Sequence, residues 1–333
     1  MNNNFFQNGG FHSNNNLFYE QAEKSSLYRT ANYTGWSVCL IFFLMAFITN
    51  LLLFIAKTFL PYSSLSSTPF SKSYPVVYLL IYGISSAIYC LIPPLILKQN
   101  LGESFNNLIK FESKGPDKQI AYIFIGLGVC WVANSITSIL ILIFNKIRIP
   151  IPSTSLYHDN KDIYSIITLF IVSALIPAIF EEFAFRGVIL GVLRKYGDTT
   201  AILISSLMFA IVHGNIVQIP FAFICGLGFA FITIKTDSLL TCIIVHFINN
   251  FRATFYDIYS PSSALIVDIV ICVLAVLSIA YVLIKDKTTL HFNDYNSSLS
   301  LKSKLSCALS TPGMITAILF TCINIIISEV SLI

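Results

Sequence analysis

Residues 163–187 read IYSIITLFIVSALIPAIFEEFAFRG, an apolar run that ends in two adjacent glutamates and an arginine. The run is long enough to cross a hydrocarbon core about 30 Å thick, which takes roughly 20 residues of helix. Ionisable residues inside such a helix are costly and rare, so Glu181, Glu182 and Arg186 need a physical reason to be there. The segment therefore predicts a transmembrane helix that carries a polar site.

The rest of the chain also has the composition of an integral membrane protein. Of its 333 residues, 56% are hydrophobic and 11% are charged, whereas soluble domains have about 25% charged residues. Apolar spans are expected at 35–60, 75–97, 120–144, 163–191, 199–213, 218–235, 239–256, 264–284 and 313–333. These continuous runs do not show the alternation of a β-barrel. We predict an all-α, polytopic transmembrane helical bundle of about eight or nine spans.

Polar segments divide the chain into four parts. Residues 1–34 are rich in Asn near their start and are expected to form a polar, disordered tail. Residues 35–145 hold the N-terminal transmembrane helices, and residues 163–256 hold the core with the buried polar residues. Residues 264–333 are expected to add C-terminal helices, joined by a polar connector at 285–312. The lysines of the 99–119 loop favour a cytoplasmic position for that loop and for the N-terminus.

The charges and cysteines indicate which partners and cofactors to expect. Most of the basic residues lie between apolar runs and do not form a nucleic-acid-binding patch. The expected partner is therefore the bilayer and not nucleic acid. Seven of the eight cysteines sit in apolar runs without C-x-x-C spacing, where thiols behave as small hydrophobes. We expect neither a disulfide framework nor a thiolate metal site.

Three short segments place polar residues at helical spacing. Glu182 and Arg186 stand at i and i+4 and are expected to pair, which leaves Glu181, about 100° away on the helix, as the candidate general base. Phe209 and His213 share one helix face, and His246 and Asn250 share another. Each segment alone has a structural interpretation, namely a glutamate pair at a helix end, an interfacial histidine, or hydrogen bonds between helices. Together they predict one buried site.

These segments resemble the CPBP intramembrane protease family, which includes the type II CAAX prenyl endopeptidases. The family pattern E-E-x-x-x-R, F-x-x-x-H and H-x-x-x-N matches residues 181–186, 209–213 and 246–250, in that order. The resemblance covers about residues 163–256. It implies an intramembrane endopeptidase whose substrate is a membrane-associated peptide or protein, prenylated in eukaryotic members of the family.

The resemblance permits two mechanisms. Without a metal, Glu181 and His213 activate a water molecule while His246 and Asn250 donate hydrogen bonds to the oxyanion. With a metal, Glu181, His213 and His246 hold one divalent, zinc-like ion, as the naming of the family as metalloproteases suggests. We favour the first, because His246 and Asn250 form a two-donor pair on one helix face. Residues expected to support the site are Glu182, Arg186 and Phe209.

Two other functions fit the same residues. A proton- or ion-coupled transporter also needs intramembrane Glu, His and Asn, but the sequence lacks an inverted repeat. A non-catalytic membrane immunity or scaffold protein would keep the fold, but its motif residues would be expected to erode, and here they are intact. High Asn, Ile, Lys and Phe usage is typical of an AT-rich bacterial genome, so we expect the protein in a bacterial cell membrane.

Overall fold

The computed structural model describes residues 10–62, 68–108, 110–111, 116–148, 151, 162–260, 262–285, 290–294 and 298–330. Within these residues the secondary structure is helical, without a strand. The elements are α1 (Gly10–Phe59), α2 (Phe70–Ser73), α3 (Pro75–Leu101), α4 (Phe105–Leu108), α5 (Pro116–Lys146), α6 (Ile163–Phe170), η1 (Ile171–Leu175), α7 (Ile176–Glu182), η2 (Phe183–Ile189), α8 (Leu190–Leu193), η3 (Arg194–Tyr196), α9 (Asp198–Val212), α10 (Gln218–Thr236), α11 (Leu239–Tyr259), α12 (Ala264–Lys285), α13 (Leu301–Leu309) and α14 (Pro312–Val330). The predicted all-α class is confirmed.

Six helices of the described residues are long and apolar enough to cross a membrane, and a seventh span arises if α13 and α14, bent by 70°, count as one. The spans are Leu17–Phe59, Pro75–Leu101, Lys118–Lys146, Ile163–Tyr196, Gln218–Thr236 and Ala264–Lys285. The segments expected at 199–213 and 239–256 are helices α9 and α11. Because α9 has 15 residues, its length of roughly 22 Å falls short of the hydrocarbon thickness. Helix α11 has 21 residues, but its polar residues make it less apolar than the six spans.

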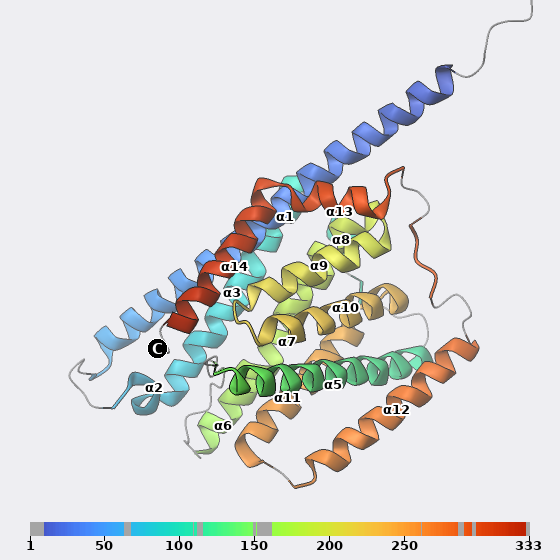
Figure 1. Cartoon of the computed structure of the whole chain (residues 1–333). Coiled ribbons are helices and arrows are strands. Elements are labelled where there is room, and N and C mark those ends of the chain that lie inside the picture. The colour runs from blue at the N-terminus through green and yellow to red at the C-terminus, as the bar shows by residue number, and fades with distance from the viewer. Residues whose placement is uncertain are drawn as a thin grey trace, which may run out of the picture.

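Helix α1 differs from the tail expected over residues 1–34. It is continuous from Gly10, and its N-terminal part projects beyond the other helices in Figure 1. The disordered tail is therefore wrong from Gly10 onward, while residues 1–9 lie outside the described part. Buried residues Leu27 and Ala31 explain the difference, because they pack in the core with helices further along the chain. Tertiary packing stabilises helix where local composition suggested a tail.

The helices form two packed groups around the central segment 163–196. Helix α1 lies against α3 and α14, and α5 lies against α10 and α12 (Figure 1). Helix α11 packs on α5, η1 and α7, which brings the third motif segment next to the first. The contact of α1 with α14 is close enough to require glycine. A Cβ atom on Gly35 would lie 2.2 Å from the carbonyl carbon of Gly313.

Segment 163–196 is one span made of helical pieces of different pitch. Asp162 caps its N-terminus by accepting hydrogen bonds from the backbone amides of Tyr164 and Ser165. The side chain of Ser165 and these amides hold the pKa of Asp162 below its usual range. Two π-helical stretches, η1 and η2, flank α7 on either side. Such π-bulges occur frequently at functional sites, and α7 carries both motif glutamates at its end.

Candidate active site

A proline and an asparagine connect the first and third motif segments. Pro177 in α7 has no amide hydrogen, so it cannot donate to the carbonyl of Ser173 four residues earlier. Asn250 of α11 provides a donor instead, because its Nδ2 atom lies 3.2 Å from the Ser173 carbonyl oxygen. The side-chain amide of Asn250 thus has one hydrogen engaged and one left for another acceptor. This hydrogen bond joins α11 to η1, the helical stretch that leads into α7 and its glutamates.

A cavity of about 180 Å³ collects residues from all three motif segments. Glu181 comes from the end of α7, His213 from the end of α9, and His246 with Asn250 from α11. All four predicted catalytic residues line this cavity. The complete lining consists of Pro177, Glu181, Phe209, His213, Gln218, Phe221, Cys225, Phe229, His246, Asn249 and Asn250. The structure therefore brings together residues that are separated by up to three helices in sequence.

Glu182 has a larger structural role than the sequence indicated. Its side chain is fully buried, and its Oε1 atom lies 3.1 Å from Nη1 of Arg186, which is the ion pair expected from the i,i+4 spacing. The same oxygen lies 2.8 Å from Nδ1 of His246. Because an ionised carboxylate only accepts, Nδ1 of His246 carries the hydrogen. His246 was expected to act with Asn250 as a second hydrogen-bond donor, and the contact of its Nδ1 with Glu182 was not predicted.

The other nitrogen of His246 faces the first glutamate. Nε2 of His246 lies 3.9 Å from Oε2 of Glu181, too far for a direct hydrogen bond and close enough for an ion pair. Glu181 is the more exposed of the two glutamates, with 19% of its side chain accessible against 0% for Glu182. The two adjacent acids therefore do different things, as the 100° rotation between them predicts. Glu181 faces the cavity, and Glu182 holds the imidazole in place.

Phe209 positions two of the charged or titratable groups. Its carbonyl oxygen lies 2.9 Å from Nδ1 of His213, so that nitrogen is the donor and Nε2 of His213 keeps its lone pair. Its ring lies 4.1 Å from Cζ of Arg186, a cation–π contact, and the ring of His213 meets it edge-on at 5.0 Å. Phe229 covers Arg186 as well, at 5.1 Å. Arg186 is thus enclosed by aromatic rings and paired with Glu182.

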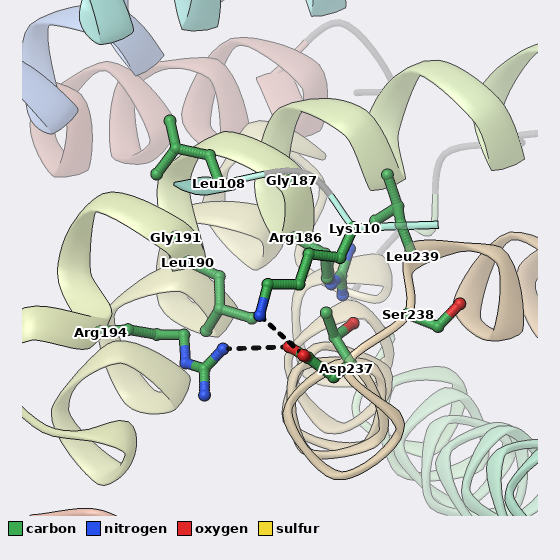
Figure 2. A pocket seen from close by; sticks show the side chains of 11 residues that line it. Leu108, Lys110, Arg186, Gly187, Leu190, Gly191, Arg194, Asp237, Ser238 and Leu239 are labelled. Atoms are coloured by element: carbon green, nitrogen blue, oxygen red, sulfur yellow. Dashed lines mark hydrogen bonds and ion pairs between the residues drawn. The ribbon is translucent and has the colours of Figure 1, made fainter. Parts of the chain in front are cut away.

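Arg186 also lies at the edge of a second, much smaller pocket of about 30 Å³. In Figure 2, Lys110 and Arg194 point toward Asp237 at this pocket, with Arg186 behind them. The Nζ atom of Lys110 lies 2.7 Å from Oδ2 of Asp237, and Nη1 of Arg194 lies 3.8 Å from Oδ1. Arg186 thus lies between its partner Glu182 and this polar end of the bundle.

Sequence reasoning missed two polar residues of the cavity. Asn249 is buried and lines the cavity, and its Nδ2 atom donates to Oδ1 of Asn250 at 3.1 Å. Gln218 begins α10 and lines the same cavity. The sequence shows two adjacent asparagines, Asn249 and Asn250. Only Asn250 was predicted as a site residue, because it stands four residues after His246. A single glutamine at the start of a span offers no comparable signal.

The three predicted metal ligands share a cavity but are not grouped around one point. Glu181, His213 and His246 line one cavity. In the part of the chain that the structure describes, however, no three His, Cys, Asp or Glu side chains are placed to hold a metal ion together. Nδ1 of His246 is engaged by Glu182 and Nδ1 of His213 by the Phe209 carbonyl. These contacts engage Nδ1 only and leave a lone pair on Nε2 of each neutral ring.

The motif core is shared with known proteins. Residues 163–252 match the family described as type II CAAX prenyl endopeptidase Rce1-like. Over this segment the chain is similar to the CPBP family. The chain is also 25% identical over 231 residues to the "Membrane-embedded CAAX protease MroQ" of Staphylococcus aureus, a match that covers 66% of this chain and 92% of that protein. No solved structure matches the chain significantly. The chain is thus a multi-pass membrane protein whose central segment resembles a protease family.

Proposed function

We propose that the protein is an intramembrane endopeptidase that hydrolyses a peptide bond in a membrane-associated peptide or protein. The observation that carries this proposal is the cavity shared by Glu181, His213, His246 and Asn250. It provides a carboxylate, imidazoles and an amide around a space of about 180 Å³. These are the groups that hydrolysis by an activated water requires.

Glu181 is the proposed general base. Its carboxylate faces the cavity. The arginine nearby in sequence, Arg186, pairs with Glu182 and not with Glu181. Nε2 of His213 retains a lone pair and is the second acceptor for the protons of the attacking water. The water adds to the scissile carbonyl carbon, its proton passes to Glu181, and the same carboxyl group then returns the proton to the leaving amine.

The oxyanion that forms on the scissile carbonyl needs donors on the α11 side of the cavity. The free hydrogen of the Asn250 amide is one donor, since the other is bound to Ser173. Nε2 of His246 is the second donor when the imidazole is protonated, and Glu182 accepts from Nδ1 in that state. Preorganised donors of this kind contribute about 2.7–4 kcal/mol each to catalysis.

The test compares purified wild type with Glu181→Gln on a library of CAAX-type and small hydrophobic peptides. Glu103→Gln is the matched control, because Glu103 is a surface glutamate paired with Lys195 at 3.0 Å. We expect Glu181→Gln to lower turnover by about 10²-fold or more, with peptide binding retained, and Glu103→Gln to behave as wild type. Cleavage that survives in Glu181→Gln would remove Glu181 from the mechanism. A wild type that binds peptides without cleaving them would favour the scaffold or immunity function.

A further inference from the structure

One end of the bundle gathers several connections and is rich in basic residues. The loop after α3 meets the end of segment 163–196 through Lys195 and Glu103, which lie 3.0 Å apart. The α10–α11 turn meets the loop after α4 through Lys110 and Asp237, as Figure 2 shows. Nζ of Lys304 in α13 donates to the carbonyl of Tyr196 at 2.6 Å. These contacts place Lys98, Lys110, Arg194, Lys195, Lys235 and Lys304 at one end, called here the basic face. Lys302 lies in the same helix α13, and Lys24 lies beside it, because its backbone carbonyl accepts from Sγ of Cys307 at 3.5 Å.

The opposite end has fewer basic residues in the described part of the chain. There the positive charges are Lys57, Lys72, Lys146, Arg148 and Arg252. Short connections rich in Lys and Arg remain in the cytoplasm when a membrane protein inserts. The asymmetry therefore assigns the basic face to the cytoplasm and the opposite end to the outer side of the membrane.

A groove of about 900 Å³ continues from the catalytic cavity. The two share Pro177, Glu181, Gln218 and Asn250, so a substrate in the groove reaches the proposed base directly. The groove is built from helix ends that lie away from the basic face. Tyr82 is near the start of α3, whose other end carries Lys98, and Tyr256 is in the last turn of α11, whose other end follows Asp237.

The groove wall presents hydrogen-bonding groups as well as apolar surface. Hydroxyl groups of Thr49, Ser86, Tyr89, Ser173 and Thr254 line it, and Oγ of Ser173 lies 2.8 Å from Oγ1 of Thr254. Hydroxyls both donate and accept, as the exposed N–H and C=O groups of an extended peptide require. Apolar residues between them suit the side chains of a membrane peptide.

Resting on the proposed protease function, we propose that this groove opens to the outer side of the membrane and that its substrate is an extended peptide segment already on that side. The reaction that supplies such a substrate is the translocation or insertion of a precursor peptide from the cytoplasm. Cleavage then occurs after export.

The first experiment measures sidedness without using activity. Single cysteines are introduced as Lys72→Cys, Lys302→Cys and Thr49→Cys, and a membrane-impermeant maleimide is added to right-side-out or inverted membrane vesicles. Wild type provides the background, because the chain has 8 free cysteines of its own. Lys72 and Lys302 are a matched pair of exposed lysines at opposite ends. We expect Lys72→Cys and Thr49→Cys to react in right-side-out vesicles and Lys302→Cys to react in inverted ones. Thr49→Cys labelled from the cytoplasmic side, or from neither side, would overturn the proposal.

The second experiment adds a charged, membrane-impermeant fluorogenic peptide to the same two vesicle preparations of wild type. We expect cleavage by right-side-out vesicles, and cleavage by inverted vesicles only after detergent is added. Cleavage by intact inverted vesicles alone would overturn the outward opening while leaving the protease function in place. Absence of cleavage in detergent would instead count against the protease function, and the labelling pattern would still decide on which side the groove opens.

Discussion

Nδ1 of His246 lies 2.8 Å from Oε1 of Glu182, a glutamate whose side chain is fully buried and also paired with Arg186. One carboxylate oxygen of Glu182 thus accepts hydrogen bonds from both the guanidinium of Arg186 and the imidazole of His246. A second carboxylate, from Glu181, faces the other nitrogen of the same imidazole. Glu182 is therefore a positioning residue that fixes the orientation and protonated nitrogen of His246, in the way a buried acid orients a catalytic histidine.

Replacing Glu182 is expected to reduce both stability and turnover. Glu182→Gln leaves the buried guanidinium of Arg186 without its counter-ion, and breaking a buried pair in this way costs about 3–5 kcal/mol. It also removes the carboxylate that holds His246. Thermal unfolding in detergent and steady-state kinetics on the purified variant measure the two effects.

A double variant separates the two roles of Glu182. Glu182→Gln with Arg186→Met removes both buried charges, so we expect stability to recover relative to Glu182→Gln while turnover stays low. Turnover that recovers together with stability would show that Glu182 acts only through folding.

The adjacent asparagines are expected to differ in their effect on the rate. Asn250→Ala removes a proposed oxyanion donor and should lower kcat by about 10²–10³-fold, with little change in KM. Asn249→Ala removes only the amide that donates to Asn250, so we expect a smaller loss of kcat. Full kinetics of both variants on one peptide provide the comparison. Equal losses would mean that the two amides act as one unit, and a larger loss for Asn249→Ala would reverse their assignment.

Removal of divalent metal is expected to leave activity unchanged. Within the described residues, the side chains of Glu181, His213 and His246 share a cavity without forming a three-ligand metal group. Wild type is dialysed against a chelator, its metal content is quantified, and peptide cleavage is measured before and after. Activity that disappears with the metal and returns when zinc is restored would establish the metal-dependent mechanism.

The contact between α1 and α14 depends on the absence of a side chain. A Cβ atom at Gly35 would lie 2.2 Å from a backbone atom of Gly313, so Gly35→Ala forces the helices apart. Overpacking of this kind costs about 1–3 kcal/mol. We expect a lower unfolding temperature in detergent for Gly35→Ala. Asn50→Ala, at an exposed position of the same helix, is the control and should unfold like wild type.

Much of the site could be predicted because its local pairs follow helical spacing. Arg186 meets Glu182 one turn away, and His213 meets the carbonyl of Phe209 one turn away. Such i,i+4 contacts depend on helix geometry alone. The π-helical stretches and the broken ladder at Pro177 were not predicted, because pitch depends on how neighbouring helices fill the space.

The sequence by itself determined that the chain is a helical membrane protein, and it indicated which polar residues share a helix face, because apolar runs and helical spacing are local properties. Only the tertiary structure decided that His246 pairs with Glu182, which is 64 residues away, and that the cavity continues into a groove at the end opposite the basic face. Contacts between helices depend on how α7 and α11 pack, and no local pattern specifies that packing.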